Sequence, residues 1–215
     1  LSLFIWALPG ELNILDGGYA QLDAMFTVAP WVFMFLIPAV TMRFFAEENR
    51  TGTIEFLLTK PLTELQLIFA KYLAALFLVC LALLPTLVYY YSINQLAIPV
   101  GNVDSGAFWG SFIGLLFLSS GFIGIGLFAS SITENQVVSF IVAVFLSFIC
   151  FTGFDALGGM DLFSSIDNFI INLGINAHYL SLSRGVIDTR DLIYFLSLSF
   201  LFVLLTRMAL ESRKW

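Results

Sequence analysis

The sequence predicts an all-α protein that crosses a membrane several times, and its composition is the main reason. Hydrophobic residues make up 60% of the 215 residues, and charged residues only 11%. Soluble globular domains average about 45–50% apolar and about 25% charged residues. Long apolar runs without alternating polarity favour helices over the strands of a membrane barrel, because a helix satisfies its own backbone hydrogen bonds in lipid. We therefore expect a polytopic transmembrane protein.

Six membrane-spanning helices are expected, of which the first is incomplete in this sequence. Residues 1–8 are apolar but would form only about 12 Å of helix. We interpret them as the end of a first span, with a secretory signal peptide as the alternative. Five complete spans are predicted at residues 25–45, 63–91, 105–131, 134–154 and 191–208. Pro38 and Pro85 are expected to bend their helices, because proline removes a backbone donor.

Lysine and arginine residues predict the orientation of these spans. If residues 43–63 are cytoplasmic, seven of the nine basic residues lie on that side, and only Arg184 and Arg190 lie outside. Cytoplasmic loops of membrane proteins carry an excess of Lys and Arg. We therefore expect both termini of an intact chain in the cytoplasm.

Residues 43–63 concentrate charge between two apolar spans and include Glu47, Glu48 and Glu55. A Thr-Gly-Thr sequence can end one helix here and start the next, predicted at residues 53–60. A short helix that only fixes the loop to lipid headgroups is one interpretation. Three glutamates suit a basic groove on a protein better than an anionic membrane surface, so we favour a docking element for a partner.

The same segment resembles a signature of type-2 ABC exporter permeases, in which paired Glu, Gly-Thr, Glu, Leu-Leu-Thr and Pro recur at a fixed spacing. The matching residues here are Glu47, Glu48, Gly52, Thr53, Glu55, Leu57, Leu58, Thr59 and Pro61. In that family the segment is the coupling helix, which sits in a cleft of the ATP-hydrolysing subunit. The resemblance implies that these residues bind a separate ABC ATPase, which carries ATP and magnesium, and that this chain is not itself an enzyme.

Shorter segments resemble the permease subunits of gliding-motility-associated ABC transporters. These segments are residues 37–43, 99–102, 176–179 and 183–191. The resemblance implies a multi-pass protein of the bacterial inner membrane with a link to gliding motility. It also implies a second, different permease chain with a large outer domain, beside the ATPase subunits and membrane lipid. No nucleic-acid partner is expected.

Motifs for catalysis, cofactor binding and metal binding are absent from the sequence. There is no G-x-x-x-x-G-K-[ST] phosphate loop, so ATP-driven work requires another polypeptide. Cys80 and Cys150 lie in different apolar runs and are interpreted as packing residues. The single His178 has no Cys or second His near it in sequence. The span centres contain essentially no ionisable side chains, which argues against a proton- or sodium-driven carrier.

Small residues recur every four positions in two spans. They are Gly106, Gly110 and Gly114 in the span 105–131, and Ser139, Ala143 and Ser147 in the span 134–154. This spacing lets helix backbones approach closely in lipid. We expect these residues to pack helices together, with the lining of a transport path as the alternative.

Two capping boxes are predicted, in which a threonine and a glutamine three residues later exchange hydrogen bonds with the backbone. They pair Thr63 with Gln66 and Thr133 with Gln136. The second box would surround a short cytoplasmic turn, where Glu134 and Asn135 are candidates for a second contact with the ATPase.

The last outer loop, residues 155–190, is long. Its apolar residues at helical spacing are Leu162, Ile166, Phe169, Ile170 and Leu173. An amphipathic helix in the outer leaflet fits this pattern, and permeases that resemble this chain carry short re-entrant helices here that shape the outer gate. Exposed local ion pairs, each under about 1 kcal/mol, are expected among Arg184, Asp188, Arg190 and Asp191.

We therefore predict one transmembrane permease domain over residues 1–215, acting as a subunit of an ATP-driven exporter. The alternative is a membrane scaffold in a motility or secretion complex. Stimulation of the ATPase during transport separates the two, because a scaffold gives none.

Overall fold

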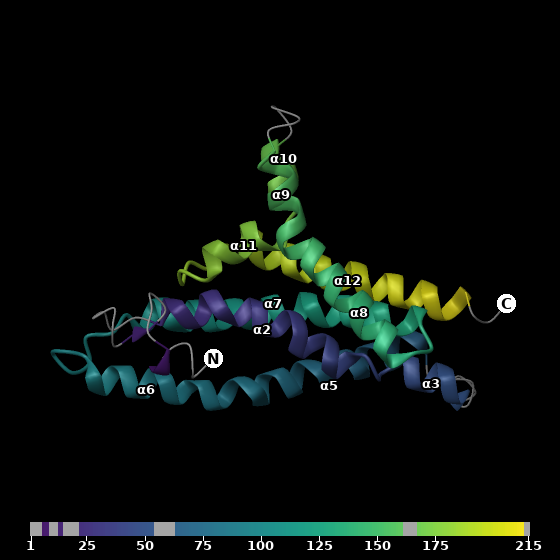
Figure 1. Cartoon of the computed structure of the whole chain (residues 1–215), viewed down its shortest axis with the longest axis horizontal. Helices are drawn as coiled ribbons and strands as arrows, with labels where there is room; N and C mark the ends of the chain where they lie inside the picture. Colours follow the sequence, from purple (N-terminus) through teal and green to yellow (C-terminus); the bar gives the residue numbers. More distant parts are fainter. Residues whose placement is uncertain (1–5, 9–12, 15–21, 54–62, 161–166, 213–215) are drawn as a thin grey trace.

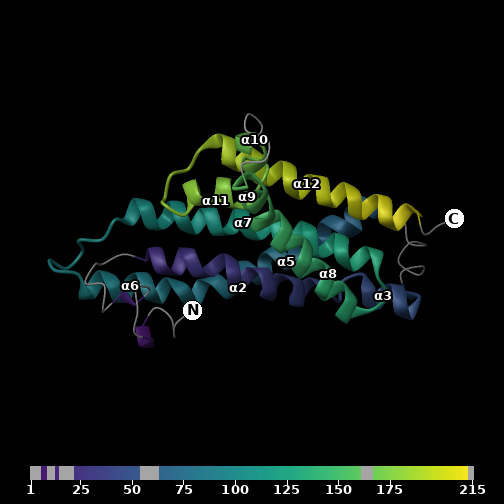
Figure 2. The same cartoon turned by 45° about the horizontal axis from the view of Figure 1, so that its top comes forward.

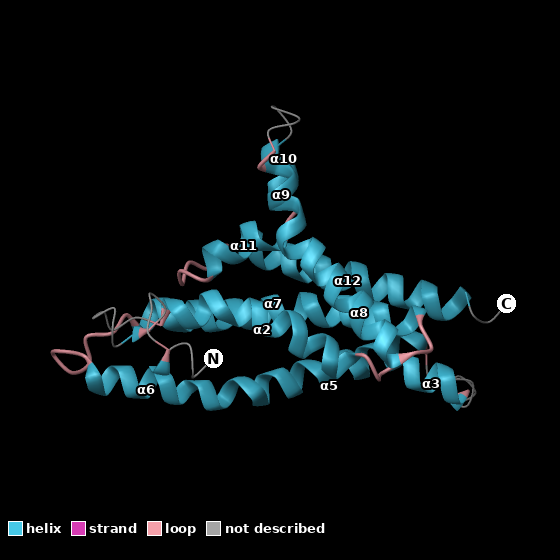
Figure 3. Ribbon diagram, viewed as in Figure 1, coloured by secondary structure: helices cyan, strands magenta, loops and turns pink. Residues whose placement is uncertain are grey.

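The computed structural model describes residues 6–8, 13–14, 22–53, 63–160 and 167–212, and residues 1–5 of the expected first span lie outside it. Its regular secondary structure is helical over these ranges, with no strand (Figure 3). The helical stretches long and apolar enough to cross a membrane are Asp23–Thr51, Glu64–Leu96, Ser105–Ile132, Gln136–Gly158 and Thr189–Ser212. The predicted all-α, polytopic fold class is confirmed.

These stretches are built from helices of different lengths. The α-helices are α2 (Asp23–Thr41), α3 (Ala46–Thr51), α5 (Glu64–Leu83), α6 (Leu87–Leu96), α7 (Ser105–Ile132), α8 (Gln136–Phe148), α9 (Phe154–Gly158), α10 (Asp167–Ile171), α11 (Ile175–Leu182) and α12 (Thr189–Ser212). The helix α2 continues through both Pro30 and Pro38. Between α5 and α6 the chain forms a 3-10 turn, Leu84–Thr86, which contains Pro85.

The start of α5 shows why the boundary near residue 63 is readable from sequence. Thr63 Oγ1 accepts from the backbone N–H of Gln66, and the Gln66 side chain accepts from the N–H of Thr63. The predicted capping box is therefore confirmed. It satisfies two backbone donors that the first helical turn leaves without partners.

The helix α7 is the centre of the bundle, with α2, α5, α8 and α12 packed around it (Figures 1 and 2). In its most apolar 18-residue stretch 72% of the residues are buried, compared with 22% in the stretch of α5 and α6. Glycines make the close packing possible. A Cβ on Gly126 would lie 2.2 Å from Thr41 Oγ1 of α2, and a Cβ on Gly124 would lie 3.5 Å from the Cα of Ser199 in α12.

The segment after α8 leaves the bundle. The helix continues through a π-helical segment, Ile149–Gly153, into α9. The helix α10 packs closely on α9, since a Cβ on Gly158 would lie 2.3 Å from Ile171 Cγ1. The α9–α10 pair stands out sideways from the middle of the bundle (Figures 1 and 2).

The described residues cover only the second half of the amphipathic helix expected in the last outer loop. Of its apolar residues, Leu162 and Ile166 lie outside the described residues. Phe169 and Ile170 belong to α10, described as Asp167–Ile171, and Leu173 lies beyond its end. The helix pairs with α9 beside the middle of the bundle (Figure 1). Side chains pack it there, because Gly158 leaves room for Ile171.

Candidate functional site at the α3 end of the bundle

The charged segment that follows the first described span forms the short helix α3. Glu47 and Glu48 lie in its first turn and Arg50 in its last, an order that complements the helix dipole. Gly52 ends the helix in a left-handed conformation with φ of 70°. Glycine adopts this conformation without steric cost, and helices commonly end this way. The predicted helix end at the Thr-Gly-Thr sequence is confirmed.

The start of α3 is capped by a side chain from α7. Ser130 Oγ accepts from the N–H groups of Phe45 and Ala46, at 2.9 and 3.1 Å, and donates to the carbonyl of Met42 at 3.2 Å. Ser130 is completely buried. The first N–H groups of a helix have no partner within the helix, so one buried hydroxyl supplies what an N-cap residue usually does.

The middle of α3 holds the end of α7. Asn49 Nδ2 donates to the carbonyls of Ser131 and Thr133, at 3.3 and 3.2 Å. The last carbonyls of α7 have no partner within that helix. The backbone at the start of α3 and the Asn49 side chain therefore both donate hydrogen bonds to the last turn of α7, and these bonds hold the two helices together.

A lysine connects α3 to α5. Lys71 Nζ lies 2.5 Å from Glu48 Oε2, donates to the carbonyl of Phe44, and lies 4.4 Å from the centroid of the Phe45 ring. Both charged side chains are mostly buried, with 16% of Lys71 and 25% of Glu48 exposed. Attraction between partly buried charges is less screened by water than that of exposed pairs. The ion pair, the hydrogen bond and the cation–π contact together fix α3 against α5.

The two adjacent glutamates of the predicted docking segment therefore differ. Glu48 points to Lys71, whereas Glu47 is exposed, as are Arg50, Gly52 and Thr53. The remaining predicted docking residues lie outside the described residues, as does nearly all of the helix expected at 53–60; they are Glu55, Leu57, Leu58, Thr59 and Pro61.

The turn between α7 and α8 lies beside α3, because Asn49 binds Thr133 there. Asn135 caps α8, and its Oδ1 accepts from Val137 N at 2.9 Å. The predicted Thr133–Gln136 capping box is wrong, since Thr133 Oγ1 instead donates to a carbonyl of α7. Asn135 is nearer to the first turn of α8 and caps it. Glu134 is exposed at this turn.

Two of the small residues predicted to pack helices, Gly110 and Gly114, lie where α7 meets the end of α11 and the turn after it. A Cβ on Gly110 would lie 2.3 Å from the carbonyl oxygen of Gly185, and one on Gly114 2.7 Å from Leu182 Cβ, so both glycines face the end of α11. A Cβ on Gly106 would meet Asp104 Oδ1 at 3.3 Å. The buried residues of α8 are Ser139, Ala143 and Ser147.

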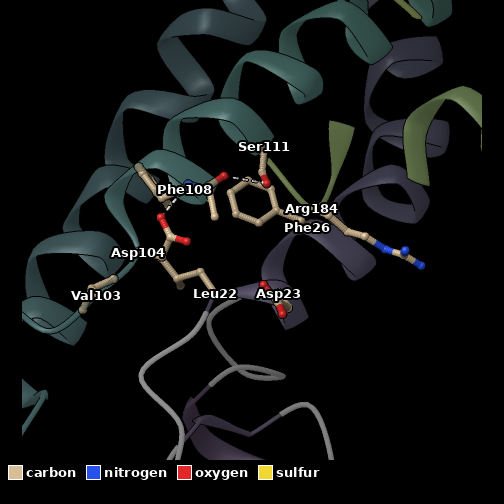
Figure 4. A pocket seen from close by; sticks show the side chains of 9 residues that line it. Leu22, Asp23, Phe26, Val103, Asp104, Phe108, Ser111 and Arg184 are labelled. Carbon is tan, nitrogen blue, oxygen red and sulfur yellow. Dashed lines mark hydrogen bonds between the residues drawn. The ribbon is translucent and has the colours of Figure 1, made fainter. Parts of the chain in front are cut away.

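At the opposite end of the bundle, a cavity of about 210 Å³ lies between the starts of α2 and α7. Asp23, Phe26, Asp104, Phe108 and Arg184 are among its lining residues. Asp104 caps α7 by accepting from a backbone N–H of that helix, and the Arg184 side chain points away from both aspartates (Figure 4). The carboxylate of Asp104 is thus the N-cap of α7.

The local ion pairs expected among Arg184, Asp188, Arg190 and Asp191 are not formed in the part of the chain that the structure describes. The Asp188 carboxylate accepts from the backbone N–H of Arg190, near the start of α12. Asp191 is buried and pairs with His178 of α11. The arginines are exposed in the described structure. Packing of α11 against α12 places His178 Nδ1 2.7 Å from Asp191 Oδ1.

Sequence reasoning missed the residues that hold α3 in place. The sequence gave no sign that Ser130 contacts another helix, because a serine in an apolar span usually bonds to its own helix. Lys71 could have been recognised, because a lysine within an apolar span is costly without a partner.

The ABC-2 family transporter protein model matches residues 12–210 of the chain. No curated protein sequence matches it. Members of this family are membrane permease subunits that work with an ABC ATPase subunit and are not themselves catalytic. The match covers almost the entire length of the chain, and the described residues include several apolar spans, as a membrane permease requires. The chain belongs to the ABC-2 family of transporter proteins and is a multi-pass membrane permease subunit.

Proposed function

We propose that this permease belongs to an ATP-driven exporter and receives the motion of its ATPase through α3 and the segment 53–60. The observation that carries the proposal is the double attachment of α3. Ser130 and Asn49 hold it to α7, and Lys71 holds it to α5. A displacement of α3 therefore displaces the ends of two long helices.

The proposed cycle is mechanical. ATP binding closes the two ATPase subunits, and the cleft that holds the coupling helix moves with them. The helices α2 and α5 adjoin the segment 42–63 in the chain and tilt with it. Hydrogen bonds act only over about 3 Å, so the contacts at Ser130 and Asn49 make α7 follow α3. Because α7 also packs against α12, the motion reaches the whole bundle.

The exposed side of α3 is the surface proposed to enter the ATPase cleft. Glu47 and Arg50 lie on it, with Gly52 and Thr53 after them. The family resemblance adds five residues of the segment 53–60 and its end: Glu55, Leu57, Leu58, Thr59 and Pro61. Glu134 in the neighbouring turn is proposed as a second contact.

The docking role is tested by charge reversal. In the Glu55→Arg or Leu57→Arg variant, the permease should insert normally but lose the ATPase during purification in detergent. The matched control is Arg207→Glu, which changes a half-exposed charge on α12 and should retain the ATPase. Full recovery of the ATPase with both docking variants would contradict the proposal.

Export, a heteromeric permease core and a role in gliding motility are finer proposals that rest on the sequence resemblance. They are tested by purifying the complex from native membranes and identifying every co-eluting chain. A second permease with a large outer domain is expected beside an ABC ATPase. A membrane scaffold would instead leave ATP hydrolysis unchanged when transport substrates are added to the reconstituted complex.

A further inference from the structure

A buried charged cluster joins α10, α11 and α12 away from the α3 end. His178 Nδ1 lies 2.7 Å from Asp191 Oδ1, and His178 Nε2 lies 2.9 Å from the carbonyl oxygen of Asn172. The Tyr194 ring stacks on the imidazole with centroids 3.9 Å apart, and its hydroxyl donates to the carbonyl of Leu173 at 2.7 Å. The turn after α10, the helix α11 and the start of α12 therefore meet at one histidine.

The two neighbours of the imidazole fix how many protons the cluster holds. A carbonyl oxygen only accepts, so Nε2 must carry a proton to bind Asn172. The 2.7 Å contact between Nδ1 and the Asp191 carboxylate requires a second proton between those two atoms. If that proton leaves for water, either Nδ1 or Nε2 presents a lone pair to an oxygen. One of the two hydrogen bonds is then lost.

The surroundings of the histidine contain no competing cation. From α12, Asp191 and Tyr194 contact the ring. From α9, Asp155 accepts from the Asn176 side chain at 2.6 Å, and α10 contributes the buried Asp167. Among the described residues, His178 is the one basic side chain that pairs with Asp191. Only the shared proton therefore neutralises this carboxylate.

The cluster lies within the length of the spanning helices. The helices α7 and α12 run parallel, with Gly124 against Ser199. Asp191 lies in the first turn of α12. Asp191 is only 7% exposed, and a carboxylate with so little exposed surface is costly to leave without a partner.

We propose that His178 and Asp191 bind one shared proton, and that this proton holds the α9–α10 pair and α11 against α12. The α9–α10 pair projects from the bundle (Figures 1 and 2). It continues from α8 at one end and into α11 through residues 172–174 at the other. The Asn172 and Leu173 carbonyls and the Asp155–Asn176 contact bind it to α11 and α12. Loss of the proton removes one of these contacts and weakens the hold of the pair on α11 and α12.

The single histidine of the chain makes the proton directly observable. The permease is labelled with ¹⁵N-histidine and assembled with unlabelled partner subunits in lipid nanodiscs. At acidic pH, both ring nitrogens should give the chemical shifts of protonated nitrogen, or Nδ1 an intermediate shift from a shared proton. As the pH rises, one nitrogen should become unprotonated. A ring with one fully unprotonated nitrogen at every pH would overturn the proposal.

Movement is measured in the same complex with spin labels on two exposed residues, Leu157 of α9 and Leu196 of α12. The distance distribution should be narrow at acidic pH and broaden or lengthen over the pH range in which His178 loses its proton. Asp191→Asn should abolish this pH-dependent change, whereas the control Glu211→Gln, in an exposed pair on α12, should retain it. A distance that does not change with pH, or an unchanged response in Asp191→Asn, would overturn the proposal. The wild-type measurements suffice if the variant fails to fold.

Discussion

Two short helices, α3 and α11, are held against the long helices by different chemistry. The hydroxyl of Ser130 in α7 and the amide of Asn49 in α3 make the hydrogen bonds that join these two helices. Lys71 of α5 adds an ion pair with α3. Around α11, a histidine shares a proton with Asp191. Hydroxyl and amide groups keep their protons in these hydrogen bonds, whereas the hydrogen bonds that an imidazole can make depend on its protonation state. The α3 attachment thus suits constant transmission of force, and the α11 attachment suits conditional movement.

The largest expected effect of a single substitution is at Lys71. Lys71→Met leaves Glu48 and the Phe44 carbonyl without their partner, and removing one member of a buried pair costs about 3–5 kcal/mol. Because both side chains are partly exposed, we expect about 2–3 kcal/mol. Thermal unfolding of the purified complex measures the loss. The double variant Lys71→Met with Glu48→Gln should recover part of it, and no recovery would show that the ion pair contributes little.

The next effect is expected at Ser130. Ser130→Ala leaves two backbone N–H groups and one carbonyl at the start of α3 without a partner, which costs about 2 kcal/mol. ATP hydrolysis should also become less dependent on the permease, because α3 no longer moves with α7. Ser197→Ala is the control, since that exposed hydroxyl bonds only within α12. Equal effects of the two variants would contradict the proposed connection.

A smaller effect is expected at Tyr179, which joins α11 to α2. Its hydroxyl donates to the carbonyl of Phe26 at 2.6 Å, and burial raises the pKa of Tyr179 above its ordinary value. The hydroxyl therefore stays protonated across physiological pH. Tyr179→Phe should lower stability by about 1 kcal/mol, equally at pH 6 and pH 8. A pH-dependent loss would mean that Tyr179, and not His178, senses the proton.

The smallest effect is expected at Arg207, whose pair with Glu211 on α12 leaves 44% of each side chain exposed. Exposed pairs one helical turn apart contribute about 0.3–0.5 kcal/mol, so Arg207→Ala should barely shift the melting temperature. A loss as large as that of Lys71→Met would remove the distinction between buried and exposed pairs on which the comparison depends.

Much of the helical plan was predictable from the sequence, and most of the candidate site was not. The span predicted at 105–131 corresponds to α7 at Ser105–Ile132, because apolar runs and their ends are local properties. The capping box at Thr63 was predictable for the same reason. The second box failed because two capping residues, Thr133 and Asn135, competed within three positions, and only backbone geometry decides between them.

By itself, the sequence determined that the chain spans a membrane as helices and that its charge gathers around residues 47–55. Both follow from composition and from contacts between near neighbours in the chain. Only the tertiary structure decided that Glu48 faces Lys71 while Glu47 faces outward, that Ser130 caps α3, and that His178 meets Asp191. These partners lie between 13 and 85 residues apart. Their meeting depends on how each helix is rotated about its axis and packed against the next, which no local pattern specifies.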